Sequence, residues 1–280
     1  MIDLHTHSSA SDGSWSPGKL VQMASDLGIK AFALTDHDCI DGVQEAEETA
    51  LSLGIRLIRG VEIEIAFSPG EFHLLGLDLA PGKSLNSLFD TELFETMKQL
   101  ARNRENRNQQ VLKKFKEAGY PVNYDEIKDK YGTRMIGRPH IAEHLVDKGI
   151  VKNRQKAFDE FLAKGKPYYI QKECIDLKEA IRLIHDAGGL AFTAHPMSLY
   201  VSWPHLKSLF IEWKELGLDG LEAWHPLARI VDCERLEQVG RELGLRISAG
   251  SDYHGPIRPD RKLGLTAGDR PIDDLFLNAI

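Results

Sequence analysis

The chain has 280 residues, 42% of them hydrophobic and 28% charged, and its formal net charge at pH 7 is −7. This composition is typical of a globular protein, and its acidic balance argues against binding of nucleic acid by bulk charge. No segment approaches the roughly 18 apolar residues of a membrane span, and the first residues do not resemble a signal peptide. The three cysteines are too few for a disulfide framework. We therefore expect a soluble, cytoplasmic protein.

Short apolar runs alternate with helical patterns in the first 80 residues and again after Asp176. Ser16 and Pro17 supply an N-cap and a first helical turn, and Asp176 forms a capping box with Glu179. Helices are expected at residues 16–27, 41–53, 176–188, 205–216 and 227–243. Strands are expected at 1–4, 31–34, 55–67 with a break at Gly60, 72–77, 190–194, 218–223 and 245–249. This alternation predicts an α/β fold with a mainly parallel sheet.

The middle of the chain follows a different pattern. Residues 85–118 are almost continuously helical, shorter helices are expected at 139–146 and 155–162, and no strand pattern occurs there. We therefore expect a helical insertion at 98–167 in an α/β body formed by 1–97 and 168–280. The insertion contains 17 Lys and Arg against 9 Asp and Glu, a net charge of +8, so the remainder carries −15. Such asymmetry suggests a phosphate-bearing partner, although a solvated helical surface explains the charge equally well.

Six of the eleven histidines lie beside carboxylates or at the ends of expected strands: His5, His7, His37, His73, His195 and His254. Sites in parallel sheets are built at the carboxyl ends of the strands, where the connecting loops converge. The two-residue period of a strand puts His5 and His7 on one face, and Glu62 and Glu64 share a face for the same reason. Imidazole and carboxylate are ligands of zinc, manganese and iron. A single histidine is more often structural, but this combination predicts a metal site.

Four motifs carry a resemblance to a known family. They are Asp3-Leu4-His5-Thr6-His7, Thr35-Asp36-His37-Asp38, Ala194-His195-Pro196 and Ser251-Asp252-Tyr253-His254. They resemble the motifs of the polymerase and histidinol phosphatase (PHP) superfamily of metal-dependent phosphoesterases, over residues 1–80 and 185–260. The resemblance implies a distorted seven-stranded β/α barrel that holds up to three metals. It also implies hydrolysis of a phosphate ester by metal-activated hydroxide.

The resemblance also assigns the metal ligands. It implies one metal on His5, His7, Glu62 and Asp252, a second on Glu62, His73 and His195, and a third on Asp12, His37 and His254. Glu64 could replace Glu62 by spacing, and the family pattern favours Glu62. Many relatives have histidine where Asp12 stands. Two or three Mn²⁺ ions are expected, with Zn²⁺, Fe²⁺ or Mg²⁺ as alternatives.

Catalytic roles are implied for two of these ligands, Asp12 and His254, and for two neighbouring carboxylates, Asp36 and Asp38. Asp36 and Asp38 would orient ligand histidines. His254 or Asp12 would deliver a proton to the leaving group. The expected catalytic residues are therefore His254, Asp12 and Asp36.

Residues 133–140 and 165–169 resemble one branch of the superfamily. That branch includes phosphatases of nucleoside 3′,5′-bisphosphates and enzymes that trim short RNA from its 5′ end. It implies that the substrate-binding residues are Arg134, Arg138, His140, Lys164 and Lys166. By contrast, Arg102, Arg104 and Arg107 are expected on the solvated face of the long helix. The expected partner is a small phosphorylated nucleotide or a short single-stranded RNA, and no membrane.

Other functions remain open. A histidinol-phosphate phosphatase would share the metals but would need an acidic pocket for the amine of its substrate. A non-catalytic module binding nucleic acid or a polymerase would be expected to have lost ligands. The match of His140, Glu143 and His144 to an inverted zinc-peptidase motif is short, and Arg138-Pro139 before it is typical of a helix start facing phosphate. Glu222 and His225 could line the site or form an ordinary turn.

Overall fold

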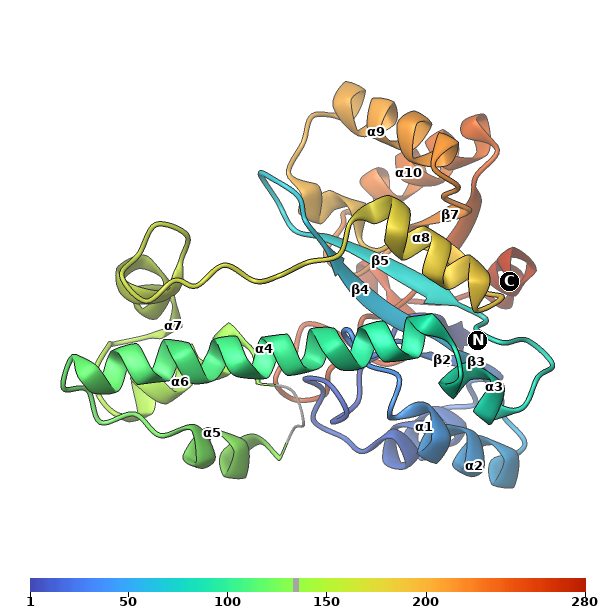
Figure 1. The fold of residues 1–280 in the computed structure, drawn as a ribbon. Coiled ribbons are helices and arrows are strands. Elements are labelled where there is room, and N and C mark those ends of the chain that lie inside the picture. The colour runs from blue at the N-terminus through green and yellow to red at the C-terminus, as the bar shows by residue number, and fades with distance from the viewer. Residues whose placement is uncertain (133–135) are drawn as a thin grey trace.

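The structure is a computed structural model that describes residues 1–132 and 136–280. It has an α/β body and an inserted helical module, and the long helix α4 (Glu92–Glu117) runs from one into the other (Figure 1). The expected α/β fold with a helical segment between two α/β halves is therefore present. Among the described residues, no helix is long and apolar enough to cross a membrane.

The first part of the body is a sheet of three parallel strands, β1 (Ile2–Asp3), β2 (Ala31–Leu34) and β3 (Arg56–Arg59). The helices α1 (Pro17–Asp26) and α2 (Val43–Leu53) connect these strands. Ser16 caps α1 by accepting the N–H of Lys19, as expected from the sequence. Leu20 and Val21 of α1 pack with Phe32 of β2 in one hydrophobic cluster, which fixes the helix on the sheet.

The second part is a five-stranded sheet in the order β4 (Val61–Ile65), β5 (Phe72–Leu77), β6 (Leu190–Thr193), β7 (Gly220–Trp224) and β8 (Arg246–Ala249). The helices α8 (Leu177–Asp186), α9 (Trp203–Glu215) and α10 (Ile230–Leu243) contribute to its main hydrophobic cluster. Asp176 caps α8 by accepting the N–H of Lys178. The strands β6, β7 and β8 are parallel, as expected.

Two details differ from the expected sheet. The strand expected at 55–67 divides at Gly60 into β3 and β4, which belong to different sheets. A Cβ at Gly60 would lie 2.7 Å from Thr35 Cγ2, so a side chain does not fit there. The strand β5 is antiparallel to both β4 and β6. The connection from β4 to β5 is too short for the crossover that a parallel pair needs.

Isolated bridges join the two sheets at their edges. His37, after β2, pairs with Glu62 of β4, and Thr6, after β1, pairs with Tyr253, after β8. The hydrogen bonds thus describe two linked sheets, and the seven-stranded barrel stays a prediction. A further short pair, β9 (Leu265–Thr266) and β10 (Arg270–Pro271), is antiparallel. Short helical turns occupy Pro196–Leu199, Ala267–Asp269 and Asp274–Ala279.

The inserted module has a hydrophobic cluster of its own, which includes Phe115, Ile127 and Ile141. Its helices after α4 are α5 (Tyr124–Tyr131), α6 (Arg138–Asp147) and α7 (Arg154–Ala157), and a π-helical turn follows at Phe158–Leu162. The long helix expected at 85–118 is two helices, α3 (Leu85–Phe89) and α4, because Thr91 caps α4. The start of α4 packs against the α/β body, so the insertion limits of 98 and 167 stay a prediction.

Candidate metal centre

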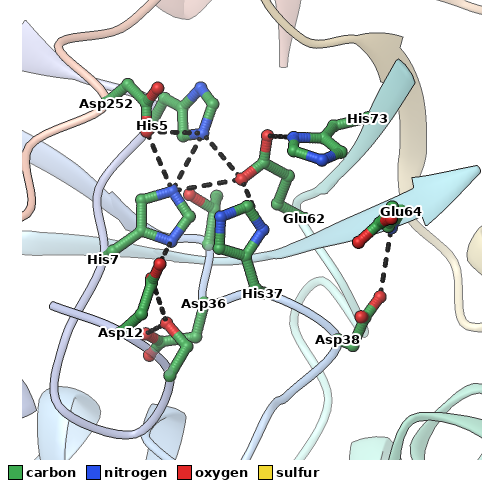
Figure 2. A network of polar contacts seen from close by, with 12 residues as sticks. His5, His7, Asp12, Asp36, His37, Asp38, Glu62, Glu64, His73 and Asp252 are labelled. Carbon is green, nitrogen blue, oxygen red and sulfur yellow. Dashed lines mark hydrogen bonds and ion pairs between the residues drawn. The ribbon is translucent and has the colours of Figure 1, made fainter. Parts of the chain in front are cut away.

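The structure brings together all nine residues predicted to bind metal, at or near the ends of strands that are distant in sequence. Figure 2 labels all of them except His195 and His254. We call these nine side chains the ligand cluster: His5, His7, Asp12, His37, Glu62, His73, His195, Asp252 and His254. Three of the strands involved, β1, β2 and β8, end at this edge of the body, and β4 and β5 supply Glu62 and His73. Most members are buried, and Asp12 is the most exposed at 27% of its side chain.

The first group is formed by His5, His7, Glu62 and Asp252. His7 Nε2 lies 3.1 Å from Glu62 Oε2 and 3.1 Å from Asp252 Oδ1, and the Nε2 atoms of His5 and His7 are 3.1 Å apart. Glu62 Oε2 and Asp252 Oδ1 are buried without a hydrogen-bond partner among the described residues. Buried polar atoms normally have such partners. Two imidazole nitrogens and two carboxylate oxygens facing one another fit a divalent cation between them.

The second group shares Glu62 with the first. Glu62 Oε1 lies 2.9 Å from His73 Nδ1 and 2.9 Å from His195 Nε2. Its other oxygen, Oε2, lies 3.0 Å from His37 Nδ1. The two oxygens of Glu62 therefore face different sets of imidazoles, which is the geometry of a carboxylate that bridges two ions.

The electrostatics of Glu62 and His73 agree with this position. Burial favours the neutral forms of both, but the surrounding imidazoles of His37, His5 and His73 hold the pKa of Glu62 well below its usual range. Burial alone would lower the pKa of His73, but the Glu62 carboxylate raises it to about 9. In the absence of another cation, histidines take up positive charge to balance buried carboxylates.

The third group contains Asp12, His37 and His254, and also His7. His254 Nε2 lies 3.3 Å from Asp12 Oδ1, and the ring of His254 stacks on that of His7 with centroids 4.1 Å apart. Because the carbonyl oxygen of Asp252 can only accept, His254 Nδ1–H donates to it over 2.8 Å. His254 Nε2 is then free to face Asp12.

Two members of the cluster have an unusual backbone conformation. His195 and Asp252 have φ values of 27° and 52° although neither is glycine. Such conformations cost on the order of 1–3 kcal/mol each and need support from their surroundings. The N–H of His195 donates to Glu222 over 2.7 Å, and the N–H of Asp252 donates to the carbonyl of His5 over 2.8 Å.

Asp36 and Asp38 do not have the contacts expected of them. Asp36 accepts from the N–H and hydroxyl of Ser8 and from the hydroxyl of Ser11, so it holds the loop between His7 and Asp12. Asp38 points away from the imidazoles, towards Glu64, whose N–H it accepts (Figure 2). Neither carboxylate has a hydrogen bond to a cluster imidazole within the described part of the chain.

Asp38 belongs instead to an ion-pair network between the body and the inserted module. It pairs with Arg104 of α4 and with Lys172, and Lys172 also pairs with Glu64. Arg104 was expected on a solvated surface, but its side chain is only 11% exposed. Both cations are therefore neutralised by carboxylates of the body, and the pair of Arg104 with Asp38 attaches the module to it.

The sequence analysis left Glu222 and His225 open and missed Arg261. Glu222 contacts His5 Nδ1 at 3.0 Å, and His225 Nε2 lies 3.0 Å from Asp252 Oδ2. Arg261 also pairs with Asp252 Oδ2, which leaves Oδ1 facing the cluster. Glu222 and His225 follow the strand-end pattern of the ligands, which is a usable signal. Arg261 lies in an irregular segment after β8, where no pattern identifies it.

A cavity of about 830 Å³ lies beside the cluster, on the side of Glu64 and Phe72. Four basic side chains, Arg107, Arg138, Lys164 and Lys172, and three acidic ones, Glu64, Glu71 and Glu173, line it. We call it the cationic cleft after Arg107, Arg138 and Lys164, which form no ion pair with the described residues. Burial and the nearby guanidinium groups of Arg104 and Arg138 lower the pKa of Arg107 to about 10. Of the predicted substrate-binding residues, Arg138 and Lys164 thus reach the cleft. Arg107, expected on a solvated face, lines it as well.

Two other predicted substrate-binding residues, Lys166 and His140, are not among the residues lining the cleft. The remaining one, Arg134, lies outside the described residues. His140 is 4% exposed, and its Nδ1 accepts the N–H of Gly137 over 2.9 Å. His144 Nε2 accepts the N–H of Asn123, and Glu143 pairs with Arg154. These bonds engage both histidines of the peptidase-like motif with the backbone, and no candidate metal group of the described residues includes either histidine.

Comparisons with known proteins agree with the geometry. The PHP domain model matches residues 3–185. A 5′-3′ exoribonuclease of Haemophilus influenzae is 36% identical over 98% of this chain and 98% of its own length. A 3′,5′-nucleoside bisphosphate phosphatase of Chromobacterium violaceum is 31% identical over 97% of this chain and 93% of its own length.

A solved structure from Bifidobacterium adolescentis, assigned to the metal-dependent phosphoesterases, superposes with a TM-score of 0.79. It is 29% identical, and the match covers 99% of this chain and 94% of that one. The family match covers well over half of the chain, and the relatives match almost all of it. The chain therefore belongs to the PHP domain family, and it is a phosphoesterase.

Proposed function

We propose that this protein is a metal-dependent phosphatase that removes the 3′-phosphate from nucleoside 3′,5′-bisphosphates. The observation that carries the proposal is the pairing of two sites, the ligand cluster and the cationic cleft beside it. Arg107, Arg138 and Lys164 form no ion pair with any residue that the structure describes. Cations without an ion-pair partner next to a phosphoester-cleaving site suit a substrate with a second phosphate.

The nine residues of the ligand cluster would hold two or three divalent ions, for which Mn²⁺ is our choice. Bound there, such ions lower the pKa of a water towards neutrality and stabilise the charge on the phosphoryl oxygens. Glu62 would lie between two ions, since its two oxygens face different imidazoles. We infer that the bridges between the two sheets complete the distorted barrel of the family and keep these strand ends together.

With two ions bound, His254 and Asp12 would act together to protonate the leaving group, because a third ion would take the place of the proton between them. Burial raises the pKa of Asp12, but the imidazoles of His254 and His37 hold it well below its usual range, so the Asp12 carboxylate accepts. His254 Nε2 lies 3.3 Å from Asp12 Oδ1, and a proton on this nitrogen would be the one delivered to the leaving oxygen. Asp36 supports this arrangement by holding the loop that carries Asp12.

The cleft would bind the 5′-phosphate and the base of the substrate. The Arg138 guanidinium lies 5.9 Å from the centre of the Tyr169 ring, and both residues line the cleft. Tyr200, which is 77% exposed, lines it as well. The cations suit the 5′-phosphate, and the aromatic rings suit stacking against a base.

A second candidate function follows from the same geometry. If the 5′-phosphate lies in the cleft, the 3′-phosphoryl group at the cluster can be a monoester or the linkage to the next nucleotide. Hydrolysis of the linkage would release one 5′-nucleotide at a time from the 5′ end of RNA. The similarity to a 5′-3′ exoribonuclease supports this second activity.

The test is release of phosphate from adenosine 3′,5′-bisphosphate with and without Mn²⁺, with short 5′-phosphorylated RNA and histidinol phosphate measured beside it. We expect metal-dependent release that is fastest with the bisphosphate and is abolished by Asp252→Ala. Turnover that does not need metal would contradict the proposal. Faster turnover of histidinol phosphate would favour that phosphatase, and tight RNA binding without hydrolysis would favour a non-catalytic module.

A further inference from the structure

Glu222 is a fully buried carboxylate on β7 to which neither the sequence nor the family comparison assigns a role. It contacts two members of the ligand cluster through atoms that do not face the cluster. Glu222 Oε1 lies 3.0 Å from His5 Nδ1, and Oε2 accepts the backbone N–H of His195 over 2.7 Å. One side chain thus touches two ligands that are 190 residues apart in the sequence.

The first contact selects the ligand atom of His5. An ionised carboxylate can only accept, so His5 Nδ1 must carry a proton to bond to Glu222. In the neutral imidazole the lone pair then lies on Nε2, which is the atom that faces His7, Glu62 and Asp252. A carboxylate behind a metal-binding histidine fixes both its tautomer and its orientation.

The second contact holds His195. The backbone of His195 has a φ of 27°, and its N–H is the group that Glu222 accepts. Its side chain is fixed separately, because Nδ1 bonds to Ser198 Oγ over 2.8 Å. His195 Nε2 is thereby directed at Glu62 Oε1.

Glu222, His5 and His225 also form a possible metal-binding group of their own, but their hydrogen bonds argue against it. His225 Nδ1 accepts the N–H of Leu227 over 3.2 Å, so its other nitrogen, Nε2, carries the proton and donates to Asp252. Neutral His225 has no free lone pair in this arrangement. Both oxygens of Glu222 are engaged as well.

Close packing leaves Glu222 and His5 little freedom. A Cβ at Gly250 would lie 2.2 Å from His5 Cβ and 2.7 Å from Glu222 Oε1. Only glycine fits at this position, so the backbone of residue 250 packs directly against His5 and Glu222. The contact is therefore part of the packed core and not an incidental bond at a surface.

We propose that Glu222 is a positioning residue of the metal centre, which presents Nε2 of His5 to the metals and holds the backbone from which the His195 side chain reaches them. The inference rests on the proposed function only in taking His5 and His195 as metal ligands. It predicts that loss of the carboxylate weakens metal binding by about 10- to 100-fold, because outer partners of metal ligands have effects of this size. Activity falls as a consequence of metal loss and recovers in part at high metal concentration.

The experiment is calorimetric titration of the metal-free protein with Mn²⁺, for the wild type, Glu222→Gln and Glu222→Ala. Glutamine keeps the shape of the side chain and one acceptor oxygen, so it can accept from His5 or from His195 but not from both as the carboxylate does. We expect the weakest binding for alanine and an intermediate affinity for glutamine. The electron paramagnetic resonance spectrum of bound Mn²⁺ should also change, which a loss of stability alone does not cause.

The matched control is Glu237→Gln on α10. Glu237 accepts from Trp224 Nε1 over 2.7 Å and contacts no member of the ligand cluster, so its metal affinity should equal that of the wild type. If Glu222→Gln binds Mn²⁺ as tightly as the wild type while its melting temperature falls, Glu222 has only a structural role and the inference is wrong. Normal metal binding by a wild type that does not hydrolyse bisphosphates would contradict the proposed function alone.

Discussion

The ligand cluster and the cationic cleft share the strands β4 and β5, but their side chains are fixed in different ways. In the cluster, several ligands have one atom facing the centre and a second atom bound elsewhere; they are His5, His195, Asp252 and His254. Asp252 shows this clearly, since His225 and Arg261 hold Oδ2 while Oδ1 stays free. In the cleft, Lys164 is exposed and has no hydrogen bond or ion pair with the described residues, and Arg138 contacts the ring of Tyr169.

The difference follows from what each region has to do. Bond cleavage depends on positions within fractions of an ångström, whereas recognition of a phosphate tolerates side chains that adjust around it. Like charges also lie close together at the cleft, because the guanidinium groups of Arg104 and Arg138 add to burial in lowering the pKa of Arg107. An anion bound there would relieve the repulsion between them. Substitutions should therefore have large effects on chemistry in the cluster and graded effects on binding in the cleft.

The largest effect is expected for Asp252→Asn. The substitution removes one negative charge from a buried group of four ligands and leaves the shape unchanged. We expect kcat/KM for the bisphosphate to fall by about 10³-fold, or about 4 kcal/mol. The control is Asp232→Asn on α10, since Asp232 pairs with Arg229 away from the cluster. Near-normal turnover by Asp252→Asn would show that the cluster is not the catalytic centre.

Metal binding should also stabilise the folded protein. Unfolding disperses the ligands, so Mn²⁺ binds the folded state alone. When the concentration of free Mn²⁺ is 100 times the dissociation constant, one site adds about 2.7 kcal/mol to the free energy of unfolding. Thermal unfolding with added Mn²⁺ and with a chelator measures this difference. We expect a higher melting temperature with Mn²⁺ for the wild type and a much smaller change for Asp252→Asn. Equal shifts in the two proteins would mean that the metal binds elsewhere.

The comparison also explains which parts of the molecule could be predicted from its sequence. The ligands of the cluster follow from two regularities, the two-residue period of strands and the position of sites at strand ends. His5 and His7 obey both, and the structure brings them together with the other predicted ligands. The parallel strands and most helices follow from periodicity and caps. The reversed direction of β5 does not, because strand direction depends on the connection between strands.

The cleft could be predicted only in part, because its residues lie on helices and loops. On α4, residues 104 and 107 are three apart and share a face, while residue 102 points away. Helical periodicity shows that residues 104 and 107 share a face, but it does not show which face of α4 packs against the body. Arg104 and Arg107 were therefore predicted to be solvated along with Arg102, and only Arg102 is exposed.

Within the cleft, the largest effect is expected for Arg107→Ala. A hydrogen bond between charged groups is worth about 1.5–3 kcal/mol, so kcat/KM for the bisphosphate should fall by about 10- to 100-fold. The rate with adenosine 3′-monophosphate, which has no second phosphate, should hardly change. Arg102→Ala, on the opposite side of the same helix, should leave both rates unchanged. A parallel loss with both substrates would assign Arg107 to the chemistry and not to recognition of the second phosphate.

The smallest effect is expected for Lys164→Ala, and it distinguishes Lys164 from Lys166, which the sequence also predicts to bind substrate. Lys164 lines the cleft, whereas Lys166, two residues later and also exposed, does not. Exposed charges contribute little because water screens them, so Lys164→Ala should raise KM for the bisphosphate by only about two- to fivefold. Added salt should reduce the difference, since screening weakens the attraction in the wild type as well. Lys166→Ala should behave as the wild type at every salt concentration. If Lys166→Ala raises KM as much as Lys164→Ala, the second phosphate responds to the charge of the whole insertion and not to the side chains that line the cleft.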